Sequence, residues 1–177
     1  MENSNLELKL WPDPVLRTKC VEKQIPTNLG DEMLKVMKAH SGLGLAAPQV
    51  GLDYRIFVME DLHEKGPGMV FANPKIVDHS REMDLGEEGC LSLLSCKVKI
   101  PRFRWVDIEF GLPYGYPYPV GDDRLEWHFE GILARCIQHE MDHLDGILIF
   151  DHITSNLAQK IWLEKYFKRK KKYDRIG

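Results

Sequence analysis

Residues 138–144 constrain this chain most, because they contain two histidines four residues apart with a glutamate directly after the first. If the segment is helical, His139 and His143 lie on one face, roughly 40° apart around the helix axis. Two imidazoles placed in this way can bind one metal ion, and Glu140 can then reach a water molecule beside it. The alternative is a buried helix whose histidines only form hydrogen bonds. The His-Glu-x-x-His spacing favours the metal site.

The flanking sequence predicts where this helix begins and ends. Gly131 precedes it, and Gly146 is suited to stop it. One broad stripe is expected to face the interior, and it comprises Ile132, Leu133, Cys136, Ile137, His139, Glu140 and His143. We therefore expect a central helix that carries both histidines inward.

Length and composition indicate an ordinary globular protein. The chain has 177 residues, of which 44% are hydrophobic and 29% are charged, so we expect one domain over residues 1–177. It contains no run of 18 apolar residues, and its polar start lacks the layout of a signal peptide. A cytoplasmic protein is expected, with neither a membrane nor DNA as its partner. Its four cysteines are then free thiols or metal ligands rather than disulfides.

Charge is distributed unevenly along the chain. Residues 160–177 carry a net charge of +6, whereas the remaining 159 residues carry −9. An amphipathic helix is expected from residue 156 to about residues 170–172, with its basic cluster at residues 168–172. An acidic body with a basic tail suggests an anionic partner for the tail. On charge alone, a solvated terminal helix is favoured.

Hydrophobic periodicity predicts the remaining elements. A helix is expected over residues 28–40, and strands over residues 54–59, 69–71, 75–78, 97–100, 103–110 and 125–129. Asn73 and Pro74 are expected to separate the strand over residues 69–71 from the strand over residues 75–78. Residues 111–123 contain three prolines and three glycines, which predicts a surface hairpin loop.

Residues 42–51 are rich in glycine and alanine, which lets a backbone come close to a ligand. A phosphate-binding loop is the alternative, but the segment lacks a Gly-Lys-Ser/Thr sequence, so nucleotide binding is not favoured. Gln49 is the polar side chain of this segment that can point at a site.

A catalytic metal normally takes three protein ligands and a water molecule. A third histidine six residues after His143 is excluded, because residue 149 is Ile. Glu164 has a suitable separation from His143. Cys90, in the sequence Glu-Gly-Cys-Leu-Ser between two expected strands, is the other candidate. The spacing of these residues leaves both possibilities open.

Three motifs occur in order along the chain: Gly-Leu-Gly-Leu-Ala-Ala-Pro-Gln at residues 42–49, Glu-Gly-Cys-Leu-Ser at residues 88–92 and Gln-His-Glu-Met-Asp-His-Leu-Asp-Gly at residues 138–146. Together they closely resemble the peptide deformylase family, and the resemblance covers about residues 10–151. It implies an α+β fold in which antiparallel sheets surround the central metal-binding helix. It also implies hydrolysis of the N-formyl group from the initiator methionine of nascent chains, with release of formate.

The resemblance assigns roles to particular residues. The implied metal ligands are Cys90, His139 and His143; the implied general acid/base is Glu140; the implied oxyanion donors are Gln49 and the backbone N–H of Leu91. The family typically uses Fe²⁺ in the cell, while Zn²⁺ is often bound but less active. The implied methionine pocket comprises Leu43, Glu88, Ile132, Cys136 and His139, and the peptide backbone is expected to pair with the edge around Gly44.

The chain departs from the family pattern at three places. Leu94 and Lys97 stand where the family commonly has Pro and Arg, and residues 111–123 form a longer loop than usual. These departures concern the rim of the substrate site. Because the substrate emerges from the ribosome, the basic cluster at residues 168–172 is a candidate for docking on ribosomal RNA.

Two other functions compete with this interpretation. One is a zinc peptidase that uses Glu164 in place of Cys90. The other is a structural metal protein or peptide-binding protein without turnover, against which the intact Glu140 and Gln49 argue.

Overall fold

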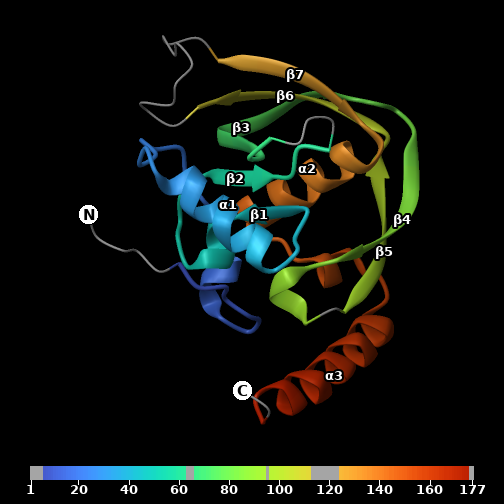
Figure 1. Cartoon of the computed structure of the whole chain (residues 1–177). Coiled ribbons are helices and arrows are strands. Elements are labelled where there is room, and N and C mark those ends of the chain that lie inside the picture. The colour runs from blue at the N-terminus through green and yellow to red at the C-terminus, as the bar shows by residue number, and fades with distance from the viewer. Residues whose placement is uncertain (1–5, 63–65, 95, 113–123, 176–177) are drawn as a thin grey trace.

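The structure is a computed structural model, and it describes residues 6–62, 66–94, 96–112 and 124–175. These residues fold into two antiparallel sheets and three helices, joined by short turns and connecting segments (Figure 1). The larger sheet has the order β1-β2-β3-β6-β7, formed by β1 (Gly44–Ala46), β2 (Ile56–Met59), β3 (Met69–His79), β6 (Trp105–Gly111) and β7 (Leu125–Glu130). The smaller sheet pairs β4 (Met83–Gly89) with β5 (Lys97–Phe103). The expected α+β class with antiparallel sheets is confirmed.

The helices are α1 (Leu29–Ala39), α2 (Gly131–Leu144) and α3 (Asn156–Tyr173), with short 3-10 turns η1 (Pro14–Arg17), η2 (Ala47–Val50), η3 (Leu91–Leu93) and η4 (Ile149–His152). Figure 1 shows α2 in the middle of the molecule, beneath the larger sheet, and α3 on the outside at the bottom. No helix among the described residues is long and apolar enough to cross a lipid bilayer.

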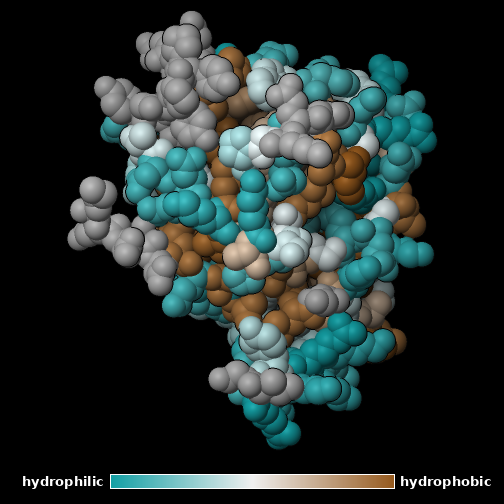
Figure 2. Space-filling model, in the orientation of Figure 1, coloured by the Kyte–Doolittle hydropathy of each residue, from teal (hydrophilic) through white to brown (hydrophobic). Residues whose placement is uncertain are grey.

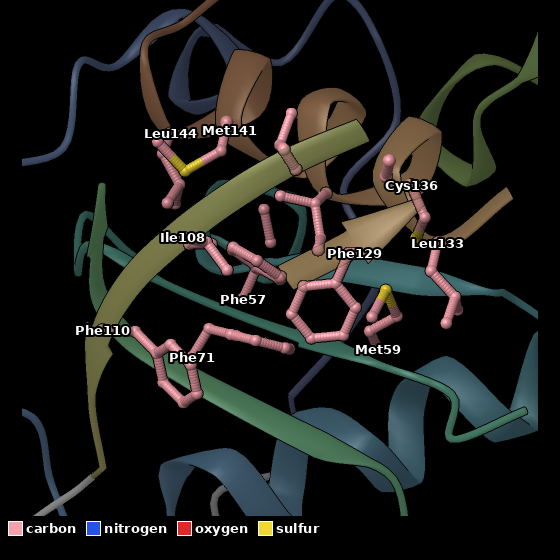
Figure 3. Packing of buried hydrophobic residues seen from close by; sticks show 14 of the residues in the cluster. Phe57, Met59, Phe71, Ile108, Phe110, Phe129, Leu133, Cys136, Met141 and Leu144 are labelled. Atoms are coloured by element: carbon pink, nitrogen blue, oxygen red, sulfur yellow. The ribbon is translucent and has the colours of Figure 1, made fainter. Parts of the chain in front are cut away.

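Aromatic side chains of the larger sheet form the surface on which α2 packs. Phe57 and Phe71 stack with ring centroids 4.6 Å apart, and Phe129 packs edge-on against Phe71. Leu133 and Met141 of α2 belong to the same buried cluster, which Figure 3 shows from close by. Burial of this cluster fixes one face of α2 on the sheet, and the adjoining face carries the candidate site residues.

Helix α2 ends where the sequence predicted, but the set of residues predicted to face the interior is wrong at one position. Gly146 adopts a positive φ of 73° just after the helix. Ile132 was expected to be buried and is 56% exposed. It lies in the first turn of α2 and lines an open pocket.

Three strand predictions need correction. Residues 69–79 form one strand, not two, because the chain passes Asn73 (φ 48°) as a bulge, with a register shift between Ala72 and Lys75. Predicted strand 103–110 is divided at Arg104, where β5 ends and β6 begins. β4 was missed, because its exposed acidic sequence lacks the apolar alternation on which the prediction relied.

The C-terminal helix exists, but it is not amphipathic. Tyr166 is its one fully buried side chain, and its hydroxyl donates to the carbonyl of Trp11. Leu157 and Ile161, two apolar residues of this predicted amphipathic helix, are 68% and 44% exposed. Figure 2 shows the lower part of the molecule, where α3 lies, as mostly hydrophilic. The hairpin loop predicted at residues 111–123 lies outside the described residues from residue 113 onward.

Candidate metal centre

Cys90, His139 and His143 meet at one point, although Cys90 is distant in sequence from the other two. Their potential ligand atoms all lie within 4.8 Å of one another, and all three residues are buried. Cys90 Sγ is 3.2 Å from His143 Nε2, and the two imidazole centroids are 5.0 Å apart. The helical spacing of α2 aligns the histidines, and the end of β4 delivers Cys90 to them.

Glu164, the alternative third ligand, does not lie in this cluster. It is an exposed residue of α3. The cluster of Cys90 and the two histidines is the one group of three possible ligands found in the part of the chain that the structure describes. The structure therefore brings Cys90, and not Glu164, to the histidines.

The chemistry of this cluster fits a divalent transition metal. A thiolate with two imidazoles suits Zn²⁺ or Fe²⁺ and disfavours Mg²⁺ and Ca²⁺. Burial, together with the charge of His139, lowers the pKa of His143 well below its ordinary value, so His143 is the neutral imidazole that metals bind. Burial opposes protonation of His139, but the hydrogen bonds with Cys90 and Glu88 outweigh it and raise the pKa of His139. The cluster therefore stabilises positive charge next to Cys90.

Glu88 orients His139 from behind. Its Oε2 lies 3.0 Å from His139 Nδ1, which leaves Nε2 of that ring for the cluster. Arg102 donates to both carboxylate oxygens of Glu88, at 2.9 and 3.0 Å, and Arg135 donates to Oε1 at 2.8 Å. Burial opposes ionisation of Glu88, yet the hydrogen bonds from His139 and Arg102 lower its pKa to about 2. Glu88 is therefore a permanently charged partner for His139.

Gln49 is held with its amide aimed at Cys90. Its Oε1 accepts a hydrogen bond of 2.8 Å from the backbone N–H of Ala46, which fixes the side chain within η2. Its Nε2 then lies 3.6 Å from Cys90 Sγ and 3.3 Å from Ser92 Oγ. Leu91 follows Cys90 as the first residue of η3, so its backbone borders the same space.

Glu140 is buried beside the cluster with one oxygen unused. It is 3% exposed, and its Oε2 has no hydrogen-bond partner among the described residues. Burial raises the pKa of Glu140 to about 7. A carboxyl group with this pKa can both accept and release a proton near neutral pH.

An open pocket of about 1050 Å³ connects these groups to solvent. Ten of the eleven site residues expected from the sequence line it: Leu43, Gly44, Gln49, Glu88, Cys90, Leu91, Ile132, Cys136, His139 and Glu140. The remaining one, His143, is not among the lining residues. Figure 2 shows hydrophobic surface in the middle of the face that carries α1 and β1. The pocket can therefore receive an apolar side chain next to the ligand cluster.

The sequence profile of the polypeptide deformylase family matches residues 6–159. The chain belongs to the peptide deformylase family. A peptide deformylase of Pseudothermotoga lettingae is 38% identical over 154 residues, which cover 85% of this chain and 84% of that protein. One from a Synechococcus species is 37% identical over 177 residues, covering 96% and 84%. The crystal structure of a peptide deformylase from Legionella pneumophila superimposes with a TM-score of 0.83 at 30% identity, covering 96% of this chain and 97% of that one.

Both single-residue departures from the deformylase pattern, Leu94 and Lys97, contribute to the pocket. Leu94 ends η3 with a positive φ of 46°, and Lys97 Nζ donates a 2.8 Å hydrogen bond to Glu87 Oε1. Both residues line the pocket.

The two arginines that hold Glu88, Arg102 and Arg135, were not predicted from the sequence. Arg102 was detectable in principle, because it shares the inward phase of Val98 and Ile100 along β5, where a charged residue requires a partner. Arg135 carried no comparable signal. Its position four residues before His139 places it on the pocket side of α2, where it also donates to the carbonyl of Ile100 at 2.9 Å.

Proposed function

We propose that this chain is a metal-dependent hydrolase that removes the N-formyl group from the initiator methionine of newly made proteins and releases formate. The observation that supports this best is the convergence of Cys90, His139 and His143 beside the buried Glu140. Family membership over residues 6–159 supports the same reaction.

In this proposal Cys90, His139 and His143 hold one divalent cation. Bound there, the cation acts as a Lewis acid and lowers the pKa of a water molecule. Glu140 accepts a proton from the water that attacks the formyl carbon, and returns it to the amine that leaves. A positioned carboxylate of this kind contributes roughly 10²–10⁴-fold to the rate.

The negative charge that develops on the formyl oxygen needs hydrogen-bond donors. We assign this role to Gln49 Nε2 and to the backbone N–H of Leu91. Because the bond from Ala46 N–H fixes Gln49 Oε1, the Nε2 group of the same amide already points toward Cys90. Loss of one such donor typically costs about 10²–10³-fold.

The substrate chain is expected to extend β1. This strand is an edge of the larger sheet and pairs only with β2 among the described residues. A peptide beside Gly44 would add as a further strand. The methionine side chain would then enter the pocket between Leu43 and Cys136, with Ile132 at its rim and Glu88 and His139 at its inner end.

Formate release from formyl-Met-Ala-Ser tests the reaction. We expect formate in stoichiometric yield, and no cleavage of the same peptide without its formyl group. Hydrolysis of internal peptide bonds without formate release would instead indicate a peptidase, and metal binding without either product would indicate a binding protein.

Within this function we propose Fe²⁺ as the metal in the cell, with Zn²⁺ as a possible replacement, and a cytoplasmic location. Oxidation of the iron or of the Cys90 thiolate would inactivate the enzyme. Activity should therefore decline faster in air than under anaerobic handling. Equal half-lives in both conditions, with stoichiometric zinc in freshly purified protein, would establish a zinc enzyme instead.

A further inference from the structure

One edge of the larger sheet carries apolar side chains that are partly exposed. β7 is the last strand in the sheet order, and its far side has no strand partner in the described part of the chain. Figure 1 shows it as the outermost strand at the top. Trp127 and Leu125 of β7 are 46% and 36% exposed.

β7 lacks several of the devices that protect natural edge strands, namely proline, lysine, inward-facing charges and a bulge. Its charged side chains lie on the outer face of the sheet. Residues 125–130 contain no proline or lysine, and β7 pairs with β6 over six consecutive residues without a register shift. The apolar positions Leu125, Trp127 and Phe129 lie opposite Phe110, Ile108 and Val106, so they occupy the inner face of the sheet.

The outer face of β7 carries acidic side chains that alternate with an arginine and a histidine. Residues 124, 126, 128 and 130 are Arg, Glu, His and Glu. Arg124 forms an ion pair with Glu109, and His128 contacts Asp107, both on β6. Alternating charge of this kind can be matched by an identical strand that runs in the opposite direction.

We propose that β7 pairs antiparallel with β7 of a second copy of this chain, about a twofold axis at Trp127. The two Trp127 side chains then lie opposite each other, and Leu125 lies opposite Phe129 of the partner subunit. On the outer face Glu126 meets His128 of the partner subunit, and Arg124 meets Glu130 of the partner subunit. Cross-strand pairs of opposite charge and of aromatic residues stabilise such a ladder.

Charge complementarity selects this register over its neighbours. A twofold pairing must be centred on a residue, because any other register would place apolar side chains opposite polar ones. Centring on Glu126 would place this residue opposite itself and Arg124 opposite His128. Centring on His128 would place Glu126 opposite Glu130. The register centred on Trp127 pairs all seven residues 124–130 with one another, and it places Arg124 opposite Glu130 and Glu126 opposite His128.

The proposed dimer leaves both pockets open, because β1 and β7 lie at opposite edges of the sheet. An interface made by one strand from each subunit is smaller than a standard interface, so we expect a dissociation constant on the order of 10 μM. Dimerisation and deformylation are therefore separable properties.

Sedimentation velocity over about 1–200 μM protein tests the proposal, since this range brackets the expected dissociation constant. We expect a monomer–dimer equilibrium. Arg124→Glu and Glu130→Arg should each weaken the dimer at least about tenfold, while the double variant should return to within about threefold of wild type, because it restores the opposite pair. Trp127→Lys should abolish the dimer. Leu85→Lys is the matched control, since Leu85 is an exposed apolar residue on β4, the edge of the other sheet.

Formate release in dilute solution, where all proteins are monomeric, should be unchanged in every variant and serves as the folding control. A wild type that stays monomeric throughout the range overturns the proposal. So does a double charge exchange that is weaker than both single variants. A dimer that Leu85→Lys disrupts and Trp127→Lys does not would place the interface on β4, and would also overturn it.

Discussion

Gly44 on β1 lies directly against the carboxylate of Glu140 on α2. A Cβ atom on residue 44 would stand 2.5 Å from Glu140 Oε1 and 2.8 Å from Cys136 Sγ. Both distances are shorter than real Cβ contacts, so any side chain at this position forces one of these groups to move. Glycine at residue 44 therefore fixes the space in which Glu140 works, and it also belongs to the strand that we expect to pair with substrate.

Gly44→Ala should keep its metal and lose activity, because the added methyl group displaces the Glu140 carboxylate. Misplacement of a reacting group by about 1 Å costs roughly a hundredfold in rate, and we expect a loss of that size in kcat. Metal content and formate release measure the two effects. Gly111→Ala is the matched control, since its Cβ would meet only the Ala72 carbonyl oxygen, at 3.7 Å. Equal kcat in wild type and Gly44→Ala would remove the steric argument.

Features set by contacts between residues close in sequence could be predicted, whereas features set by contacts between distant segments could not. His139, Glu140 and His143 are set by helical spacing, which is local and can be read directly from the sequence. Cys90 depends on how β4 and η3 pack against α2, and residue spacing alone could not choose between it and Glu164. The resemblance to the peptide deformylase family favoured Cys90, and the structure brings Cys90 to the two histidines.

Features that depend on solvent exposure were predicted less well. Ile132 and Ile161 have the residue type of a core position, yet they are 56% and 44% exposed. β4 has the opposite property, since its acidic sequence resembles a loop and is held as a strand by pairing with β5 over seven residues. Periodicity reports the preference of a segment, whereas burial depends on partners elsewhere in the chain.

Cys90→Ala should lose its metal, whereas Glu164→Ala should retain it. The reason is that Cys90 Sγ lies among the histidine ligand atoms, while Glu164 is exposed on α3. Elemental analysis of both purified variants, prepared beside wild type, measures the difference. A full complement of metal in Cys90→Ala would refute the ligand assignment, and loss of metal in Glu164→Ala would revive the peptidase alternative.

Glu140→Gln should bind metal normally and release formate about 10²–10⁴-fold more slowly, because it removes the proton acceptor while keeping the shape of the side chain. Single-turnover formate release isolates this step from product release. Metal analysis of the same preparation excludes a collapsed site. The acid/base role would be wrong if the single-turnover rate stayed near that of wild type.

Glu88→Gln should weaken metal binding about 10–100-fold, since Glu88 orients His139 through Nδ1. Competition with a chelator measures this change. The variant should also alter acid stability. The pKa of Glu88 is lowered from 4.5 to about 2, so its stabilising contribution is present above pH 4.5 and is lost as pH falls toward 2. The free energy of unfolding of the metal-free protein, measured with urea, should therefore fall more steeply with decreasing pH over this interval in wild type than in Glu88→Gln. Parallel pH profiles would contradict the charged role of Glu88.

The last prediction concerns the basic end of α3, which we propose as a contact for ribosomal RNA. Lys168, Lys171 and Lys172 are exposed there. Lys170 is held by Asp174 at 2.9 Å, and Arg169 Nη1 lies 3.6 Å from Cys96 Sγ, so changing either could disturb the helix itself.

Replacement of Lys168, Lys171 and Lys172 by glutamine should therefore reduce cosedimentation with ribosomes. The remaining binding should be less sensitive to salt, because fewer phosphate contacts release fewer counterions when the complex forms. Lys19, Lys38 and Lys75 are exposed lysines elsewhere, and the same three-residue exchange there removes equal charge as a control. Turnover of a short formyl peptide should be unchanged in both triple variants, since none of these lysines lines the pocket. If both variants bind ribosomes as wild type does, α3 has no role in recruitment. If both lose binding equally, net charge and not this helix is responsible.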